Sequence, residues 1–543
     1  MTSLYRLFSQ CYDSLAHRVP GLLRGASVLD SLLFAYFVFL IVKLVRGRRT
    51  PMFPPGPSRL PILGNALQIP PDQQWLTFDA WVRQYGDVVG ITVMGQPTVI
   101  LGSVQAASDL LEGRGNIYSN RPTAVMAGEL VGWDRGLGYA PGPSDARFRE
   151  FRRLFHQFMG PRPSQAPNIL RMQEWSAVDL VSRIIKNPDS FMKHARQITG
   201  ALILALAYGY TVSPDQDEDE LVNIAERAMQ GFARASEPGA FLVDNFPILK
   251  HLPDWVPGTP FKKEARRMYE DRKRLYDVPF DLVQKAMKHG EAPLSFTSAY
   301  LLEKGSPSPV EEELIKAAAA SLYSGGADTT PSTLSSFILA MTLHPAVQER
   351  AQAELDAVIG QDWTRLPTFA DQPNLPYVNA VVLELLRWNP AVPLGLPHRL
   401  TQADVYRGFV LPEGTIVWPN IWSMLHDKSA FPNPSAFLPD RYLQDDGTLK
   451  DLDKAEDPAV IGFGFGRRCP GMYLAINSIF IAVTTMLYTL HITKVKDETG
   501  TEITPQPDYR GFIAHPSPFK CCIVPRSKEA EALVNKSIHG ESD

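Results

Sequence analysis

The sequence predicts an α+β fold that is mainly α, with small β-sheets and a single N-terminal membrane helix ahead of the folded body. Segments with apolar residues at helical spacing dominate the chain after residue 60. Segments that alternate between apolar and polar residues around a turn are short and few. A continuous apolar run at 31–42, SLLFAYFVFLIV, is long enough with its flanks to cross a bilayer as a helix.

The N-terminal part divides into a leader (1–25), a transmembrane anchor (26–46) and a basic, proline-rich hinge (47–60). Lys43 closes the apolar run and arginines follow it at 46, 48 and 49, and positive charge beside a span favours the cytosolic side. A cleaved signal peptide is the alternative. It fits less well, because the apolar core starts late and arginines, not a small-residue cleavage site, follow it. We therefore expect a retained anchor.

Composition places the body among ordinary globular proteins, since 45% of the 543 residues are hydrophobic and 21% are charged. The net charge of -4 provides no global basic field, which argues against a nucleic-acid partner. The four cysteines have neither disulfide-scaffold nor zinc-ligand spacing: Cys11, Cys469, Cys521 and Cys522. This usage indicates cytosolic redox conditions. We expect Cys521 and Cys522 to be buried as small apolar side chains.

Helices are expected at roughly 171–187, 193–208, 217–235, 310–343, 345–359, 375–388 and 472–490. The last of these is nearly all apolar and should be buried. Hairpins are expected at 87–101 and 408–418, each around a turn with Gly and Pro. The body extends over 61–525, and the polar segment 526–543 is predicted to be a loose tail.

A cysteine lies among glycines and arginines just before the apolar helix, in Phe463-Gly-Phe-Gly-Arg-Arg-Cys469-Pro-Gly471. A helix N-terminus and two adjacent arginines should lower the pKa of the thiol and favour thiolate. A thiolate so placed is a soft metal ligand or a nucleophile. Taken alone, the motif is also compatible with a buried structural cysteine.

Three other motifs precede this cysteine. Glu384-Leu-Leu-Arg387 puts opposite charges three residues apart on a helix, which alone is typical of a surface pair, and Pro439-Asp-Arg441-Tyr442 follows downstream. The predicted helix at 310–343 contains Gly325-Gly-Ala-Asp328-Thr329. Two adjacent glycines cost a helix about 1 kcal/mol each, which is tolerated where something must approach the backbone.

In this order, the proline hinge, the Gly-Gly-Ala-Asp-Thr helix, the Glu-x-x-Arg helix, the Pro-Asp-Arg-Tyr segment and the cysteine loop resemble the cytochrome P450 family. The resemblance covers nearly everything after residue 50, and 344–360 is most similar to fungal secondary-metabolism members. It implies the cytochrome P450 fold over 61–525, a heme b cofactor and electrons from NADPH-cytochrome P450 reductase. It also implies a monomer with a single pass through the endoplasmic reticulum membrane and a cytosolic catalytic domain.

Carried over residue by residue, the resemblance assigns Cys469 as the axial thiolate ligand of the haem iron. Thr329 and Asp328 would be catalytic and deliver protons during oxygen activation. A structural cluster behind the haem would consist of Glu384, Arg387 and Arg441.

The haem propionates would be bound by Arg152, His398 and Arg467 through charge-assisted hydrogen bonds. Two features depart from the family pattern. The cysteine loop is one residue short between its second arginine and Cys469, although Arg467 keeps its place when counted back from the cysteine. Phe148 stands where the family usually has tryptophan, so an indole N–H donor is lost.

The resemblance implies a haem-dependent monooxygenase that hydroxylates or epoxidises an apolar small molecule, in terpenoid, polyketide or aromatic secondary metabolism. It also implies that the substrate pocket is lined by 125–139, 322–327, 392–396 and 512–515. A haem-thiolate isomerase or dehydratase is an alternative, against which the Asp-Thr pair argues. A degenerate haem protein is another, because of the short loop.

Overall fold

The computed structural model describes residues 52–143, 145–213, 219–237 and 239–539. The predictions for the leader, the membrane anchor and the basic part of the hinge lie outside the described residues. The chain divides into two compact units, a small one with residues up to Phe53 and Val405–Leu411, and a large one with the rest. In the small unit the Val410 N–H donates to the Met52 carbonyl oxygen. Everything described below as a site belongs to the large unit.

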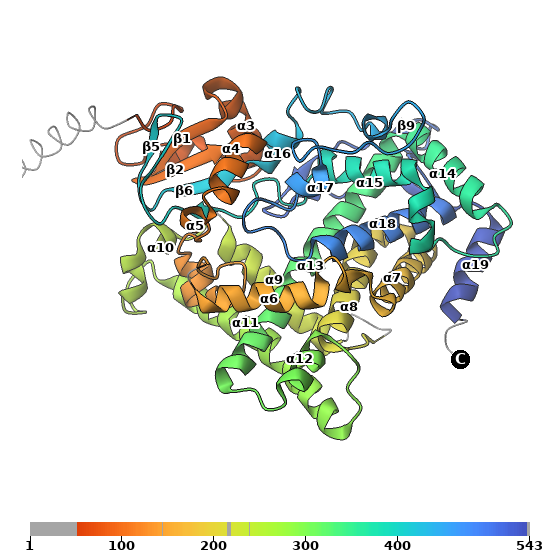
Figure 1. Cartoon of the computed structure of the whole chain (residues 1–543), viewed down its shortest axis with the longest axis horizontal. Helices are drawn as coiled ribbons and strands as arrows, with labels where there is room; N and C mark the ends of the chain where they lie inside the picture. Colours follow the sequence, from red (N-terminus) through yellow and green to blue (C-terminus); the bar gives the residue numbers. More distant parts are fainter. Residues whose placement is uncertain (1–51, 144, 214–218, 238, 540–543) are drawn as a thin grey trace, which may run out of the picture. The chain divides into compact units, whose positions relative to one another are not determined.

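The large unit is rich in helices and has small sheets, as Figure 1 shows. The seven predicted helices are confirmed, with ends that differ by a few residues: α7 (Pro167–Lys186), α8 (Phe191–Tyr208), α9 (Glu220–Ser236), α13 (Pro309–Leu343), α14 (Pro345–Ile359), α15 (Pro376–Trp388) and α18 (Met472–Thr489). Helix α13 starts at a capping box in which Ser308 and Glu311 each satisfy the other's backbone N–H.

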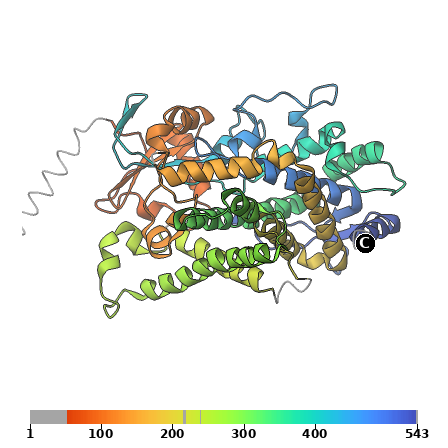
Figure 2. The ribbon, with the colours of Figure 1, turned by 60° about the horizontal axis from the view of Figure 1, so that its bottom comes forward.

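Further helices complete the described part of this unit. The longer ones are α3 (Gln74–Tyr85), α6 (Ala146–Met159), α11 (Pro260–His289), α12 (Phe296–Lys304) and α19 (Lys528–His539). The short ones are α4 (Val104–Ala107), α5 (Gly115–Tyr118), α10 (Leu242–Asn245), α16 (Ile421–Leu425) and α17 (Pro458–Ile461). Figure 2 shows α11, in yellow-green, running along one side of the helical layer.

The prediction of a loose tail is wrong for Lys528–His539, because these residues form α19. Ala530, Leu533 and Val534 are buried, and α19 packs against α7. These apolar positions recur at helical spacing within a mostly polar segment, so composition alone hid them. Just before α19, Arg526 binds Asp356 through two hydrogen bonds of 2.8 Å.

The main sheet has the strand order β1 (Val88–Val93), β2 (Gln96–Leu101), β6 (Ile416–Pro419) and β3 (His398–Arg399). The predicted hairpin at 87–101 is confirmed as β1 and β2, which pair antiparallel. Two-stranded sheets pair β7 (Leu490–Thr493) with β12 (Cys522–Pro525), β8 (Val495–Lys496) with β9 (Glu502–Ile503), and β10 (Tyr509–Arg510) with β11 (His515–Pro516).

The predicted hairpin at 408–418 is wrong. Strand β4 (Asp404–Tyr406) pairs with β5 (Phe409–Leu411), while β6 pairs with β2 and β3. Arg407 and Gly408 between β4 and β5 have φ values of 49° and 82°, the left-handed pair of a two-residue hairpin turn. The turn therefore lies earlier in the sequence than the Pro-Glu-Gly segment suggested.

The core of the large unit is built around α13, which packs against α8, α18 and α11. Helix α18 is the one described helix with the length and apolar composition of a membrane span, and most of it is buried inside the protein, as predicted from its sequence. The expectation that both C-terminal cysteines are buried is wrong, because Cys521 is half-buried and Cys522 is exposed.

Candidate functional site

A cavity of about 360 Å³ lies beside α13. Its wall brings together α6, α8, α13, the segment after α15, the cysteine loop and the turn between β10 and β11. Residues from all four predicted pocket segments reach it, among them Leu137, Leu322, Leu396 and Phe512. The cysteine loop and the predicted substrate segments thus border one continuous space.

Cys469 lies in the cavity wall, and the free surface of its side chain borders the cavity. The loop closes despite its missing residue, because the Cys469 N–H donates to the Phe463 carbonyl oxygen at 3.0 Å. Gly466 makes this possible: its φ is +64°, and a Cβ there would lie 2.0 Å from the Leu111 carbonyl oxygen. The shortened loop therefore depends on glycine at this position.

The predicted lowering of the thiol pKa is wrong for the protein without iron. Burial raises the pKa of Cys469, and the opposing effects of the Gly471 N–H and the Arg152 charge do not overcome it. Arg468 turns away from the sulfur, toward the Val460 carbonyl oxygen and Met472. A thiolate at this place therefore needs a cation beside it, which a bound iron would supply.

Three guanidinium groups gather at one side of the cavity: Arg121, Arg152 and Arg467. Each is held by backbone carbonyl oxygens, for example Arg467 by those of Ala140 at 2.8 Å and Leu137 at 2.9 Å. Burial and the neighbouring arginines lower the pKa of Arg467 to about 8, and burial lowers that of Arg121 to about 10.

Like charges held together away from water require an anion for stability, so this cluster fits a ligand with carboxylates. Arg152 and Arg467 were predicted from the sequence, whereas Arg121 was missed. Nothing in the residues around Arg121 distinguishes it from a surface arginine, and the fold alone brings it to the cavity. Phe148 lies under Arg467, with the guanidinium carbon 4.4 Å from the ring centre, so an aromatic ring still supports the cluster.

His398 is buried in β3 and borders the same cavity. Its Nδ1 lies 2.9 Å from the Tyr118 carbonyl oxygen. Burial, together with the charges of Arg121 and Arg467, holds the pKa of His398 well below its usual range. In this state the neutral ring can donate Nδ1–H to the Tyr118 carbonyl oxygen, and the bond of His398 to a haem propionate stays a prediction.

The two residues predicted to be catalytic are neighbours on helix α13 but face different surroundings. The Thr329 hydroxyl donates to the Gly325 carbonyl oxygen at 2.9 Å and borders the cavity. Asp328 does not line the cavity and instead faces His515 Nε2 at 3.0 Å and Arg196 Nε at 3.8 Å. Burial works to raise the pKa of Asp328, but these two neighbours outweigh it and lower the pKa.

The two glycines of α13 have different roles. A Cβ on Gly326 would lie 2.8 Å from Ile203 Cδ1, so this glycine allows α8 to pack closely. A Cβ on Gly325 would meet nothing within 4 Å, because this glycine faces the cavity. The prediction that something approaches the helix backbone here is confirmed for Gly326.

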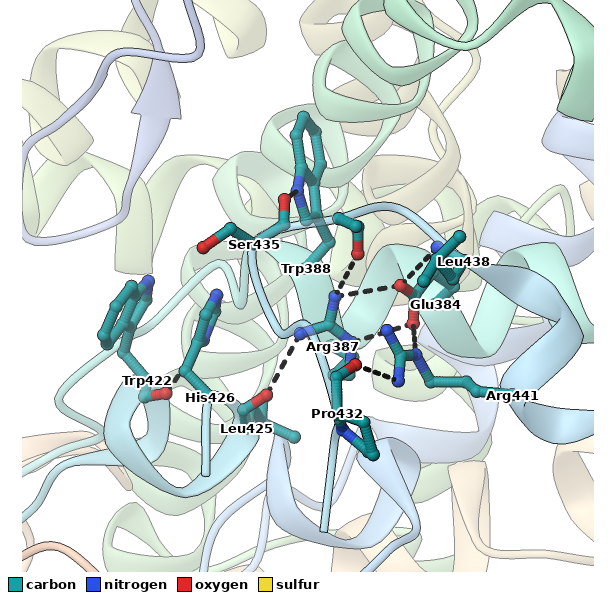
Figure 3. Close-up of polar contacts among 11 residues, drawn as sticks. Glu384, Arg387, Trp388, Trp422, Leu425, His426, Pro432, Ser435, Leu438 and Arg441 are labelled. Carbon is teal, nitrogen blue, oxygen red and sulfur yellow. Dashed lines mark hydrogen bonds and ion pairs between the residues drawn. The ribbon is translucent and has the colours of Figure 1, made fainter. Parts of the chain in front are cut away.

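The Glu384–Arg387 pair is fully buried and is not a surface pair. Figure 3 shows the Glu384 carboxylate between Arg387 and Arg441, with N–O distances of 2.8 and 3.1 Å to their Nε atoms. The Leu438 N–H donates to the same carboxylate at 2.7 Å. Arg387 also donates to the Leu425 and Ala436 carbonyl oxygens. This cluster ties α15 to the segment 425–441.

The sequence model of the cytochrome P450 family matches residues 54–523. The chain belongs to the cytochrome P450 family. It is 46% identical to cytochrome P450 monooxygenase 208 of Postia placenta, over 93% of this chain and 97% of that protein. It is 42% identical to cytochrome P450 monooxygenase claR of Ampulloclitocybe clavipes, over 89% and 88%, and 39% identical to cytochrome P450 monooxygenase ple1 of Rhodocybe pseudopiperita, over 89% and 91%.

As a P450 monooxygenase, this protein is an oxidoreductase with haem iron ligated by a cysteine thiolate, and a reductase partner is typical of its family. The site fits that cofactor. The cavity has a free thiol on its wall and three guanidinium groups that no described carboxylate neutralises. An iron porphyrin with two propionates would supply both missing partners, a cation for sulfur and carboxylates for the arginines.

Proposed function

We propose that this P450 hydroxylates or epoxidises an apolar small molecule of terpenoid, polyketide or aromatic type in secondary metabolism. The observation that carries the proposal is the single cavity that joins the Cys469 thiol, the Thr329 hydroxyl and the apolar segments. A pocket with apolar walls and few polar groups suits a substrate of this kind.

Cys469 would ligate the iron, and Arg121, Arg152 and Arg467 would hold the propionates, with neutral His398 beside them. When bound, the haem supplies the oxygen activation that no side chain can perform. Two electrons would come from NADPH through NADPH-cytochrome P450 reductase. Cys469, in its glycine-supported loop, keeps the sulfur oriented toward the cavity.

Thr329 and Asp328 are proposed to be the proton-delivery residues. The Thr329 hydroxyl already borders the cavity and can pass a proton inward, while it donates to Gly325 in this state. The Asp328 carboxylate lies one residue away, on the outer side of α13, where water reaches 29% of its side-chain surface. A proton taken up at Asp328 Oδ1 would therefore travel from solvent toward Thr329 Oγ1.

Substrate orientation would depend mainly on shape. Apolar side chains in the cavity wall include those of Ile203, Phe232, Leu322, Leu396, Phe512 and Ile513. Ser321 and Ser324 supply hydroxyls on α13, but each donates to a backbone carbonyl oxygen of its own helix. An apolar skeleton would displace water from these walls and gain hydrophobic stabilisation.

We also propose a monomer anchored by residues 26–46 in the endoplasmic reticulum membrane, with the catalytic domain in the cytosol. The continuous apolar run and the arginines after it support this placement.

Co-expression with a reductase and a panel of apolar skeletons tests the function. We expect the reduced, carbon-monoxide-bound protein to show an absorption band at about 450 nm, the signature of thiolate ligation. We also expect an oxygenated product whose formation requires NADPH. Cys469→Ser should abolish both, whereas Cys522→Ser, at an exposed cysteine, should retain both. Product formation without NADPH would favour the isomerase or dehydratase instead, and absence of the band would favour a degenerate haem protein.

A further inference from the structure

The turn between β10 and β11 connects the cavity to the outer side of α13. Phe512 and Ile513 in this turn line the cavity. His515 follows them at the start of β11, and its Nε2 lies 3.0 Å from Asp328 Oδ1 on α13. Ile513, which a ligand in the cavity would touch, is therefore separated by one residue from His515, the partner of Asp328, and Phe512 is separated by two.

Other contacts also hold the turn: the Gly511 N–H donates to Asp72 Oδ1 at 3.1 Å, Asn389 Nδ2 donates to the Ala514 carbonyl oxygen at 3.4 Å, and two further bonds act on the backbone of Ala514. The Ser332 hydroxyl donates to the Ala514 carbonyl oxygen at 2.7 Å, and the Ala514 N–H donates to the Ala391 carbonyl oxygen at 2.8 Å. None of these bonds involves Asp328. Of these contacts, only that of His515 links the position of the turn to the carboxylate.

The His515–Asp328 contact is short, but the geometry and exposure of the pair make it weak. His515 Nε2 makes no well-aligned hydrogen bond, and the His515 and Asp328 side chains are 21% and 29% exposed. Arg196 on α8 is the other cation facing Asp328, at 3.8 Å and 56% exposed. Burial raises the pKa of Tyr323 on α13, and the charges of Glu226 on α9 and of Asp328 raise it further. Partly exposed pairs of this kind contribute little and open easily.

We propose that His515 is a positioning residue that makes Asp328 responsive to ligand: a molecule that displaces Phe512 or Ile513 moves His515 and frees the Asp328 carboxylate. Before ligand binds, the ion pair retains Asp328 outside the cavity; after ligand binds, Asp328 can rotate and exchange protons. This rests on the proposed role of Asp328 in proton delivery. By linkage, a ligand that opens the pair binds more tightly once the pair is removed.

The test uses the haem-loaded full chain and two iron ligands of different size, imidazole and clotrimazole, with affinity read from the shift of the haem absorption band. Clotrimazole is much larger than imidazole, so the proposal requires that clotrimazole, and not imidazole, contacts the turn. In His515→Leu we expect clotrimazole affinity to rise about 2- to 5-fold, the scale of a partly exposed ion pair. Imidazole affinity should not change.

Arg196→Gln is the matched control, because it removes the other cation beside Asp328 and leaves the turn untouched. It should produce no gain in clotrimazole affinity. An equal gain in Arg196→Gln, an equal change for imidazole, or no change in His515→Leu would each overturn the proposal.

The failure of this inference differs from the failure of the proposed function. If Asp328→Asn leaves the yield of product per NADPH unchanged, the proton role of Asp328 is wrong, while the azole measurements still decide the link to the turn. If Asp328→Asn lowers that yield and His515→Leu binds clotrimazole with the same affinity as the wild type, the proton role of Asp328 stands and the link to the turn is wrong.

Discussion

Removing the buried carboxylate of Glu384 should destabilise the fold far more than removing an exposed carboxylate with the same spacing. Glu384 accepts four hydrogen bonds, two from Arg387 at 2.8 and 2.9 Å, one from Arg441 at 3.1 Å and one from the Leu438 N–H at 2.7 Å. Glu384→Ala would leave Arg387, which has no exposed surface, without its counter-charge.

The magnitude follows from these contacts. Removing one member of a buried ion pair costs about 3–5 kcal/mol, and an orphaned N–H such as that of Leu438 adds about 1 kcal/mol or more. We therefore expect Glu384→Ala to lower the free energy of unfolding by at least about 4 kcal/mol, a large share of the roughly 5–15 kcal/mol that stabilises a folded domain.

Glu150→Ala is the matched control. Glu150 and Arg153 on α6 have the same three-residue spacing and an N–O distance of 2.9 Å, but their side chains are 46% and 39% exposed. Such a pair contributes less than about 1 kcal/mol. Urea unfolding followed by tryptophan fluorescence would measure both variants against the wild type. If the two substitutions differ by less than about 1 kcal/mol, the buried cluster does not stabilise the protein as reasoned here.

Three further predictions concern other parts of the molecule. Gly326→Ala should be less stable than Gly325→Ala by about 1 kcal/mol, since only the first places a Cβ against Ile203, and urea unfolding of the two variants compares them; equal stability would refute the packing argument. Arg121→Ala should lose haem to an acceptor globin several-fold faster than Arg149→Ala, an exposed arginine on α6; equal rates would exclude Arg121 from cofactor binding. Burial works to raise the pKa of Asp356, but the hydrogen bonds and charge of Arg526 hold the pKa below its usual value. The Asp356–Arg526 pair therefore stabilises the docking of α19 above pH about 3.9, and this stabilisation is lost as pH falls through the lower pKa of the folded protein. Proteolysis of 528–539 should increase at that low pH in the wild type, and already at neutral pH in Arg526→Ala.

The confirmed predictions share a physical basis, which is regular periodicity. Helices such as α13 and α18 carry an apolar pattern long enough to decide their conformation locally. The errors lie where a few residues decide. The turn at Arg407 and Gly408 depends on two left-handed residues, and α19 depends on three apolar side chains in a polar segment. A pattern search weighted by composition overlooks both.

The candidate site shows the same division. Cys469, Thr329, Arg152, Arg467 and His398 were predicted from motifs, and the structure brings all of them to one cavity. Their charge states were not predictable, because burial acts against the effect of neighbouring charges and only the fold sets the depth of burial. The Cys469 thiol and the His398 ring both ended in the state that burial favours.

By itself the sequence determined the family, the order of the main helices and the cysteine that would hold the iron, because those depend on residue types at fixed spacing along the chain. The tertiary structure alone decided that Arg121 joins the cation cluster and that Asp328 faces His515 rather than the cavity. These are contacts between segments far apart in the chain. Local propensity contains no information about such distances, since they exist only once the core has packed.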